Sequence, residues 1–478
     1  MRKIPKVQIL KRLRSENSWW DRIETFPDIY VDFKPRAYLK LFYPLLTKRD
    51  PHRAVVLMGS RRVGKTVMIH HAIQRLIDDG VHPKQICYFS VDHPIYTGLG
   101  LEDLIEAYQQ STGVDFRKID CFVFFDEIQY LKDWEVHLKI IVDCYKNIKC
   151  VVSGSAAAAL RLRSIESGAG RFTNFLLPPL TFHEYLELLD KEFLVEEKDD
   201  GEGFFKTDNI NQLNKSFVHY LNFGGYPEVI FSKEIQSDPS RFIKSDIVDK
   251  VLLRDLPGLY GIQDIQELNY LFSTLAFNTA NEVSLEELSK GSGVAKNTIK
   301  RYIEYLEAAF LIKIVHRVDR NARRFKRANF FKVYLTNPSI RSALFTLVNE
   351  GDDFIGHLAE TAIFSQWFHD DFPLHYARWK GGEIDIVSIH PDKETSWAVE
   401  VKYSDRFYDR PSDLKNVFQF CATNKLQQIA ITTRKKSGIK VINNLELEFV
   451  PTSLYCYTIG RNLIRGKKKS AEFNDDEI

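Results

Sequence analysis

The stretch that decides the fold reads Arg53-Ala-Val-Val-Leu-Met-Gly-Ser-Arg-Arg-Val-Gly-Lys-Thr66. Its first part is a short apolar run of strand length, its second part matches G-x-x-x-x-G-K-[ST], and a helical pattern continues to about Asp79. This order of strand, glycine-bearing loop and helix favours phosphate binding, because backbone N–H groups converge at the start of the helix. The sequence therefore predicts a phosphate-binding loop over residues 59–66.

Each residue type in this loop has a chemical reason to be there. The glycines let the backbone turn toward phosphate oxygens, the Lys65 ammonium can reach the β- and γ-phosphates of ATP, and the Thr66 hydroxyl can bind Mg²⁺. The predicted nucleotide-binding residues are Gly59, Ser60, Arg61, Arg62, Val63, Gly64, Lys65 and Thr66.

A second apolar run, residues 120–125, predicts a buried strand that ends in two acids. Beside a phosphate-binding loop, Asp126 would hold Mg²⁺ and Glu127 would polarise the attacking water. The alternative is an ordinary strand end with two solvated acids. A third strand ends at Ser153-Gly-Ser155, where Ser153 or Ser155 could lie against the γ-phosphate, although this sequence is also typical of a plain turn.

Several motifs in one order resemble a family of prokaryotic AAA-type ATPases, over about residues 30–455. They are the phosphate-binding loop and the runs Asp126–Trp134, Ser153–Ser155, Gly170–Arg171 and Leu177–Tyr185. In that family a winged-helix region and a C-terminal domain similar to restriction endonucleases follow the ATPase. The resemblance implies a candidate arginine finger at Arg171, acting in cis or from a neighbouring subunit of a homo-oligomer. The alternative is a structural or surface arginine.

Length and composition limit the remaining possibilities. A chain of 478 residues suggests about three domains of roughly 150 residues each. A net charge of +2 excludes a polycation that coats nucleic acid, and 44% hydrophobic residues exclude an acidic disordered chain. The six cysteines form no C-x-x-C pair, and no apolar stretch suits a signal peptide or a membrane span. We expect a soluble cytoplasmic protein with reduced cysteines.

The expected fold class is α/β, with a parallel P-loop sheet covered by helices on both faces, then a winged-helix region, then a second, smaller α/β domain. The predicted parts are an N-terminal extension (1–30), an AAA-type ATPase domain (31–190), an acidic loop and helical connector (191–265), a winged helix (266–345), a nuclease-like domain (346–460) and a disordered charged tail (461–478).

A helix-turn-helix is predicted around Gly291-Ser-Gly293. Ser284 and Glu287 have the spacing of a capping box, and an amphipathic helix resumes after the glycines. Its outward residues would include Lys296, Lys300 and Arg301. The segment 313–327 follows, rich in Lys and Arg with Asp319 as its single acid, where a winged helix carries its wing. We expect the basic wing, Arg317 to Arg327, to contact DNA phosphates; the alternatives are a protein contact or a solvated hairpin.

Polar residues in the C-terminal part form a second constellation, with Glu360, Asp385, Glu400 and Lys402 as the candidate catalytic residues. The alternation of Gly381–Val387 places Glu383 and Asp385 on one strand face with Ile384 and Ile386 on the other, and the next strand offers Glu400 and Lys402. Glu360 would approach from a helix. Gathered carboxylates favour Mg²⁺, and a lysine beside them can activate water. With Asp385 and Glu400 as metal ligands, this arrangement resembles the PD-(D/E)xK nuclease superfamily, although no Pro-Asp dipeptide is present.

The leading hypothesis is therefore an ATPase coupled to a DNA-contacting winged helix and a Mg²⁺-dependent nuclease-like domain. The coupling would involve the acidic loop or the Gly224-Gly225 turn. The alternative is an ATP-dependent switch that binds DNA or protein partners through a catalytically inactive nuclease-like domain. A third hypothesis is an ATPase that acts on protein partners alone.

Overall fold

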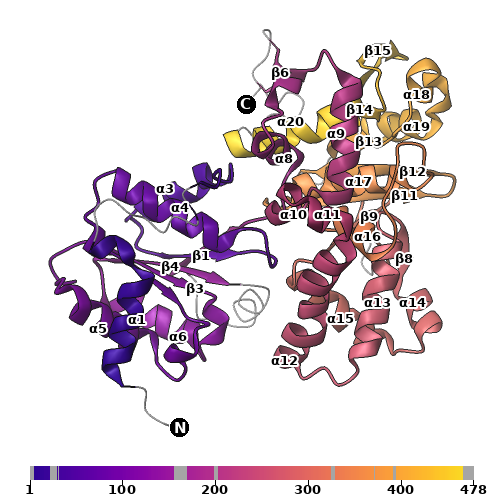
Figure 1. Cartoon of the computed structure of the whole chain (residues 1–478). Helices are drawn as coiled ribbons and strands as arrows, with labels where there is room; N and C mark the ends of the chain where they lie inside the picture. Colours follow the sequence, from indigo (N-terminus) through magenta and orange to yellow (C-terminus); the bar gives the residue numbers. More distant parts are fainter. Residues whose placement is uncertain are drawn as a thin grey trace. The chain divides into compact units, whose positions relative to one another are not determined.

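The computed structural model describes residues 5–21, 30, 32–154, 170–198, 203–324, 329–370, 372–390 and 395–466. The chain forms two compact units, Met1–Leu177 (unit 1) and Pro178–Ile478 (unit 2), which are described separately (Figure 1). No helix among these residues is long and apolar enough to cross a membrane. In the same ranges all six cysteines are free, and all but the exposed Cys144 are buried.

Unit 1 is built on a five-stranded parallel sheet. Its strand order is β2-β3-β4-β1-β5, with the bounds β1 (Ala54–Met58), β2 (Ile86–Ser90), β3 (Cys121–Asp126), β4 (Ile148–Gly154) and β5 (Phe172–Leu176). Strands β3 and β4 are buried along their whole length, as expected of apolar runs covered on both faces. β4 lies between β1 and β3, and because both pair with it in parallel, β1 and β3 end at the same edge of the sheet.

Helices cover both faces of this sheet, which confirms the predicted architecture. α3 and α4 lie on one face, and α1, α5 and α6 lie on the other (Figure 1). Their bounds are α1 (Lys6–Glu16), α3 (Leu39–Thr47), α4 (Lys65–Asp78), α5 (Leu101–Thr112) and α6 (Trp134–Cys144), with short 3₁₀ turns η1 (Ser18–Trp20), η2 (Pro83–Gln85), η3 (Pro94–Tyr96) and η4 (Ile128–Tyr130).

Unit 2 contains a nine-stranded mixed sheet in the order β15-β16-β14-β13-β12-β11-β9-β10-β8. The bounds are β8 (Glu282–Ser284), β9 (Ile312–Val318), β10 (Phe330–Leu335), β11 (Leu374–Trp379), β12 (Gly382–Ile389), β13 (Thr395–Glu400), β14 (Gln428–Thr433), β15 (Gly438–Ile442) and β16 (Leu445–Pro451). A separate short pair joins β6 (Glu196–Glu197) to β7 (Phe205–Lys206).

The helices of unit 2 pack on both faces and at one end of this sheet. They are η6 (Glu192–Leu194), α8 (Phe182–Leu188), α9 (Ile210–Phe223), α10 (Pro227–Phe231), α11 (Lys233–Ser237), π-helical η7 (Ser240–Asp249) and η8 (Val251–Asp255), α12 (Leu256–Tyr260), α13 (Ile265–Phe277), α14 (Leu285–Ser292), α15 (Lys296–Ala308), α16 (Ser339–Leu344), α17 (Ile355–Gln366), α18 (Arg406–Asp409), η9 (Pro411–Asp413), α19 (Lys415–Asn424) and α20 (Thr452–Arg465). One core lies between the sheet and α8, α9, α17 and α20, and a second lies under α19.

This arrangement differs from the predicted division of the chain. The units separate after Leu177 rather than at residue 190, because α8 packs against α20 in unit 2. The strands expected in a separate winged helix belong to the same sheet as those of the predicted nuclease-like part, since β9 pairs in parallel with β11 at His316 and His375. The C-terminal α/β part is therefore in the larger unit, and sequence periodicity contained no signal for this long-range pairing.

Candidate functional site

The glycine-bearing loop lies between β1 and α4, as the sequence predicts. Gly64 precedes α4 with φ 94°, a left-handed conformation that glycine adopts at little cost. At the start of the loop, a Cβ on Gly59 would lie 2.4 Å from the carbonyl oxygen of Leu177, so a side chain has no room there. The buried Arg36 guanidinium donates a hydrogen bond to the Val63 carbonyl at 2.7 Å. These contacts fix the path of the loop.

Lys65 directs its ammonium group back over the loop. The residue is 5% exposed, and Nζ donates hydrogen bonds to the carbonyl oxygens of Gly59 at 3.1 Å and Ser60 at 3.0 Å. Ser60 is also buried, whereas Arg62 is exposed. A lysine held here can exchange carbonyl oxygens for phosphate oxygens, because both are hydrogen-bond acceptors.

Thr66 and Asp126 meet where α4 begins and β3 ends. The Thr66 hydroxyl donates to Oδ2 of Asp126 at 2.6 Å, and the Tyr88 hydroxyl donates to the same oxygen at 2.9 Å. Ser153, at the end of β4, donates to Oδ1. Asp126 is 2% exposed. A hydroxyl and a carboxylate in contact are oxygen donors suited to Mg²⁺, so this pair fits the predicted metal role.

Glu127 follows β3 in a left-handed conformation, with φ 57°. Its backbone N–H donates to the Ser153 hydroxyl at 3.3 Å, and the Gln129 amide donates to its Oε2. The Glu127 carboxylate is therefore oriented by a neighbour two residues along the chain. Of the two serines considered from the sequence, Ser153 contacts Asp126 and Glu127, and Ser155 lies outside the described residues.

Arg171 lies at the opposite edge of the sheet from these residues. Its carbonyl accepts a hydrogen bond from Ala54 at 3.0 Å, at the beginning of β1, whereas the phosphate-binding loop follows the end of β1. A five-residue strand separates the two edges by about 16 Å. The Arg171 guanidinium instead pairs with Asp143 at 2.9 Å. This position does not favour a finger role within one chain, and a role of Arg171 in cis or in a neighbouring subunit stays a prediction.

The predicted helix-turn-helix consists of α14 and α15. The Ser284 hydroxyl accepts a hydrogen bond from the Glu287 N–H at 3.1 Å and caps α14, and Gly293 ends that helix with φ 74°. Lys300 and Arg301 are exposed on α15. Lys296 is also exposed and lies 3.7 Å from Glu286 on α14.

The basic wing is only partly described, because residues 325–328 fall outside the described ranges. Arg317 donates two hydrogen bonds to the carbonyl of Arg378, the shorter at 2.9 Å, so it stabilises the junction of β9 with β11. Arg320, Arg323 and Arg324 are exposed. Among the described residues of the wing, these three arginines are accessible to phosphate.

The predicted C-terminal residues do meet in one place. Lys402 Nζ lies 2.7 Å from Oε1 of Glu400 and 3.5 Å from Oδ2 of Asp385. The Val401 N–H donates to the same Asp385 oxygen at 2.9 Å. Together with Glu360 and Glu383, these acids form what we call the carboxylate cluster: Glu360, Glu383, Asp385 and Glu400.

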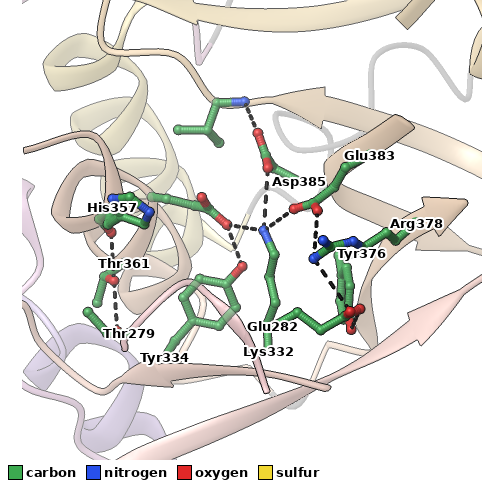
Figure 2. Close-up of polar contacts among 12 residues, drawn as sticks. Thr279, Glu282, Lys332, Tyr334, His357, Thr361, Tyr376, Arg378, Glu383 and Asp385 are labelled. Atoms are coloured by element: carbon green, nitrogen blue, oxygen red, sulfur yellow. Dashed lines mark hydrogen bonds and ion pairs between the residues drawn. The ribbon is translucent and has the colours of Figure 1, made fainter. Parts of the chain in front are cut away.

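Sequence reasoning missed a residue that joins three of these acids, Lys332 of β10 (Figure 2). Its Nζ lies 2.6 Å from Glu383, 2.8 Å from Glu360 and 3.4 Å from Asp385, and the residue is 2% exposed. The available signal was a lone lysine in the apolar run Phe330–Leu335. A charge in such a run is buried only when it is paired.

The strand alternation expected around Asp385 is interrupted. His375 pairs with Val387 whereas Ala377 pairs with Ile384, so β12 carries one more residue than β11 between these pairs. As a result Ile384 packs in the core under α19 and Ile386 packs in the other core. The expectation that Ile384 and Ile386 share one face is wrong, because an extra residue in a strand reverses the alternation.

Burial and charge shift the pKa values in the cluster. Burial raises the pKa of Glu360 to about 7, and it also raises the pKa of Glu400 with added repulsion from Asp385. Burial alone would raise the pKa of Asp385, but the Lys402 and Lys332 ammonium groups lower it. Burial alone would lower the pKa of Lys332, but Glu360 and the neighbouring acids raise it well above its usual value. Lys332 is therefore a permanent cation at neutral pH.

The cluster does not fit the predicted divalent cation as it stands. Among the described residues, no group of three or more His, Cys, Asp and Glu side chains is arranged to hold a metal ion. The carboxylates of Glu360, Asp385 and Glu400 each pair with an ammonium group instead. Lys332 lies 3.4 Å from Oδ1 of Asp385 and Lys402 lies 3.5 Å from Oδ2, so both oxygens already face a cation.

Sequence comparisons agree with the geometry of unit 1. A model of AAA domains matches residues 51–186, and a model of a domain of unknown function matches residues 214–351. An uncharacterized protein of Methanocaldococcus jannaschii is 24% identical over 352 residues, which cover 73% of this chain and 74% of that protein. An uncharacterized protein of Haemophilus influenzae is 22% identical over 356 residues, 73% of this chain and 82% of that protein.

Two solved structures are similar only in part. The first is the Aeropyrum pernix Orc1 protein in complex with DNA, which is 12% identical with a TM-score of 0.31; the match covers 67% of this chain and 94% of that one. The second is the replication initiator DnaA bound to AMPPCP and single-stranded DNA, which is 15% identical with a TM-score of 0.28; the match covers 57% of this chain and 87% of that one. Scores of this size do not establish a shared fold. The sequence match and the loop-bearing parallel sheet together support an AAA-type P-loop ATPase domain in this chain.

Proposed function

We propose that the protein binds and hydrolyses ATP at the loop of residues 59–66 and uses the nucleotide state to control a DNA-contacting unit 2. The contact between Thr66 and Asp126 carries the ATPase part of the proposal, because it joins the hydroxyl of the loop to the acid of β3. The loop backbone and Lys65 would bind the phosphates, and Thr66 with Asp126 would hold Mg²⁺. When bound, Mg²⁺ neutralises charge that develops on the phosphates.

Glu127 would orient and deprotonate the attacking water. Its carboxylate lies directly after Asp126, at the strand end that faces the loop, and the Gln129 amide limits its rotation. A carboxylate positioned in this way can accept a proton from water as the bond to the γ-phosphate forms. The proposed role of Glu127 as a base therefore requires only Glu127 and Gln129, which follow the carboxyl end of β3.

Unit 2 would contact the DNA backbone through α15 and the basic wing. The support is the chain order of α13, β8, α14, α15, β9 and β10, in which a helix-turn-helix precedes a hairpin, as in winged helices. Lys300 and Arg301 are exposed on the second helix, and Arg320, Arg323 and Arg324 are exposed on the hairpin. Exposed cations of this kind give phosphate contact without base recognition.

Coupling would pass through the connector Leu177–Leu180. In unit 1, the Leu177 N–H donates to the Met58 carbonyl at 2.7 Å, directly before the phosphate-binding loop. In unit 2, the Leu180 N–H donates to the Gly225 carbonyl at 2.9 Å, in the Gly224-Gly225 turn. Between them stand Pro178 and Pro179, whose rings restrict the backbone. A stiff connector attached at both ends can transmit a displacement of the loop.

A second candidate function is Mg²⁺-dependent cleavage of nucleic acid by Glu360, Asp385, Glu400 and Lys402. One observation favours it: within the described residues, the buried Oε2 of Glu400 has no hydrogen-bond partner, as an oxygen reserved for a ligand would. Against it, Lys332 and Lys402 already pair with the acids. The geometry therefore favours the switch, in which unit 2 binds DNA or a protein partner without cutting it.

The test uses purified protein with single- and double-stranded DNA, with and without ATP and Mg²⁺. We expect the parent chain to hydrolyse ATP and Lys65→Ala to lose this activity. The control is Lys84→Ala, the same substitution at an exposed lysine of unit 1, which should keep the activity. Unchanged hydrolysis in Lys65→Ala would refute the ATPase. For the coupling, we expect ATP to change the DNA affinity of the parent chain and not of Pro178→Gly/Pro179→Gly. DNA cleavage that disappears in Asp385→Asn would replace the switch with the nuclease.

A further inference from the structure

Lys332 stands where the nuclease-like interpretation requires a divalent cation. We propose that its ammonium group is the resident cation of the carboxylate cluster and holds Glu360, Glu383 and Asp385 together in place of a metal ion (Figure 2). The inference concerns unit 2 alone, so it does not depend on the proposed ATPase.

The donor capacity of Lys332 matches the acids around it. An ammonium group has three N–H donors and no acceptor, and three carboxylates lie within 3.4 Å of this nitrogen. The three acids come from α17 and from two positions of β12, so they converge from different directions. Glu360 receives a further hydrogen bond from the Tyr334 hydroxyl at 2.6 Å. The side chain of Lys332 is 3% exposed, which leaves water little access to its charge.

The oxygens that remain do not form a coordination sphere. Oδ2 of Asp385 accepts the Val401 N–H at 2.9 Å and faces Lys402, and its Oδ1 faces Lys332. Mg²⁺ requires about six oxygen ligands near 2.1 Å in octahedral geometry. Insertion of a divalent ion would also place it beside two buried ammonium groups, which repel it at short range.

The charges of the cluster nearly balance without a metal. Four carboxylates face Lys332, Lys402 and, at the rim, Arg378, whose Nη1 lies 3.4 Å from Glu383. A buried cation is retained when opposite charges and hydrogen bonds compensate for its lost hydration. Removal of Lys332 would leave an excess of negative charge, which is the condition under which a divalent ion binds.

The same contacts join segments far apart in the sequence. Lys332 belongs to β10, in the part predicted to be a winged helix, whereas Glu360 and Asp385 belong to α17 and β12 of the predicted nuclease-like domain. The resident lysine therefore joins the hairpin of β9 and β10 to the C-terminal part of the sheet. A nuclease-like fold whose acids pair with lysines instead of a metal ion can still bind a partner, although it does not cleave nucleic acid.

Binding of Mn²⁺ to the full-length, nucleotide-free chain tests the proposal. All proteins carry Thr66→Ala, so that the P-loop does not contribute, and bound Mn²⁺ is counted by loss of the free-ion paramagnetic resonance signal. The variants are Lys332→Met, which removes the charge at similar length, Lys332→Arg, which keeps it, and Asp385→Asn alone or combined with Lys332→Met. Thermal unfolding with and without Mn²⁺ provides a second readout.

We expect the parent, Lys332→Arg and Asp385→Asn to bind Mn²⁺ equally weakly. The Lys332→Met variant should gain one Mn²⁺ site per chain, and Mn²⁺ should stabilise this variant against thermal unfolding. The double variant Lys332→Met/Asp385→Asn should lack that site. Mn²⁺ binding by the parent that disappears in Asp385→Asn would overturn the proposal, as would a folded Lys332→Met that gains no site. If Lys332→Met does not fold, the comparison of the parent with Asp385→Asn decides by itself.

Discussion

The hydroxyl of Thr66 lies 2.6 Å from Oδ2 of Asp126, although sixty positions separate the two residues in the chain. The sheet order explains the contact, because β1 and β3 flank β4 and end at the same edge. Tyr88 donates to the same oxygen from β2 at 2.9 Å. α4, β2 and β3 therefore meet at the buried Asp126 carboxylate, beside the phosphate-binding loop.

The first prediction concerns the hydroxyl of Thr66. Thr66→Ala removes a candidate Mg²⁺ ligand and should lower the rate of ATP hydrolysis on the order of 100-fold, whereas Thr66→Ser should keep most of it. Tyr88→Phe is the control, because it removes the other hydrogen bond to Oδ2 and no metal ligand. Steady-state phosphate release at several Mg²⁺ concentrations measures the effect. Equal losses in Thr66→Ala and Tyr88→Phe would show that Thr66 only positions Asp126.

The second prediction separates binding from hydrolysis at Glu127. Glu127→Gln keeps the shape of the side chain but cannot accept a proton, so ATP affinity should be unchanged while turnover falls by about 10² to 10⁴-fold. A fluorescent ATP analogue measures the affinity and a single-turnover assay measures the chemistry. Gln129→Ala should have the smaller effect, since it removes only the orienting hydrogen bond. A Glu127→Gln variant with normal turnover would exclude Glu127 as the base.

The third prediction tests the remaining role of Arg171. If its pairing with Asp143 is only structural, Arg171→Ala and Asp143→Ala should each change ATP hydrolysis by about twofold or less, because an exposed ion pair contributes little. An arginine finger supplied to a neighbouring subunit would instead cost about 10³-fold or more in Arg171→Ala alone. Turnover measured across protein concentrations distinguishes the two outcomes.

The fourth prediction concerns the basic wing. We expect weaker binding to DNA of any sequence in the triple variant Arg320→Gln/Arg323→Gln/Arg324→Gln. The slope of log affinity against log salt should decrease in magnitude by roughly 2 to 3, because about one counterion fewer is released on binding for each phosphate contact that is lost. The control is Lys84→Gln/Lys118→Gln/Lys132→Gln, with the same change in charge on exposed residues of unit 1. Equal effects of both triple variants would indicate general charge attraction rather than a wing contact.

The fifth prediction is a pH dependence of stability in unit 1. Burial lowers the pKa of His70 to about 4, and its ring stacks on Tyr30 at 4.3 Å between centroids. The unfolded chain takes up a proton below about pH 6.5 and the folded chain does not, so stability falls as the pH drops from 6.5 toward 4. Between pH 7 and pH 5 this group should cost about 2 kcal/mol.

His70→Phe provides the measurement, since it keeps an aromatic ring and removes the titration. Urea unfolding of the parent and the variant at pH 7 and pH 5 should show a smaller decrease in the free energy of unfolding for His70→Phe. The same decrease in both proteins would mean that other groups account for the pH dependence.

Local patterns were sufficient for the elements that carry the candidate nucleotide site of unit 1. A run of apolar residues followed by glycines, Lys65 and Thr66 predicts strand, loop and helix, and the acids after residue 125 follow another buried strand. These signals are short-range, so the sequence predicted them at the right places. Local patterns did not reveal where Arg171 lies relative to the loop, because this depends on how β5 pairs with β1.

In unit 2 the sequence determined which residues carry charge, and the tertiary structure decided what that charge does. Glu360, Asp385, Glu400 and Lys402 were visible as candidates; Lys402 contacts Asp385 and Glu400, and Lys332 joins Glu360 to Asp385. Lys332 was not visible, because its partners are brought to it by pairing of β9 with β11 across some sixty positions and by the extra residue in β12. A carboxylate binds a metal or an ammonium group according to what lies within a few ångströms, and only the folded chain sets that distance.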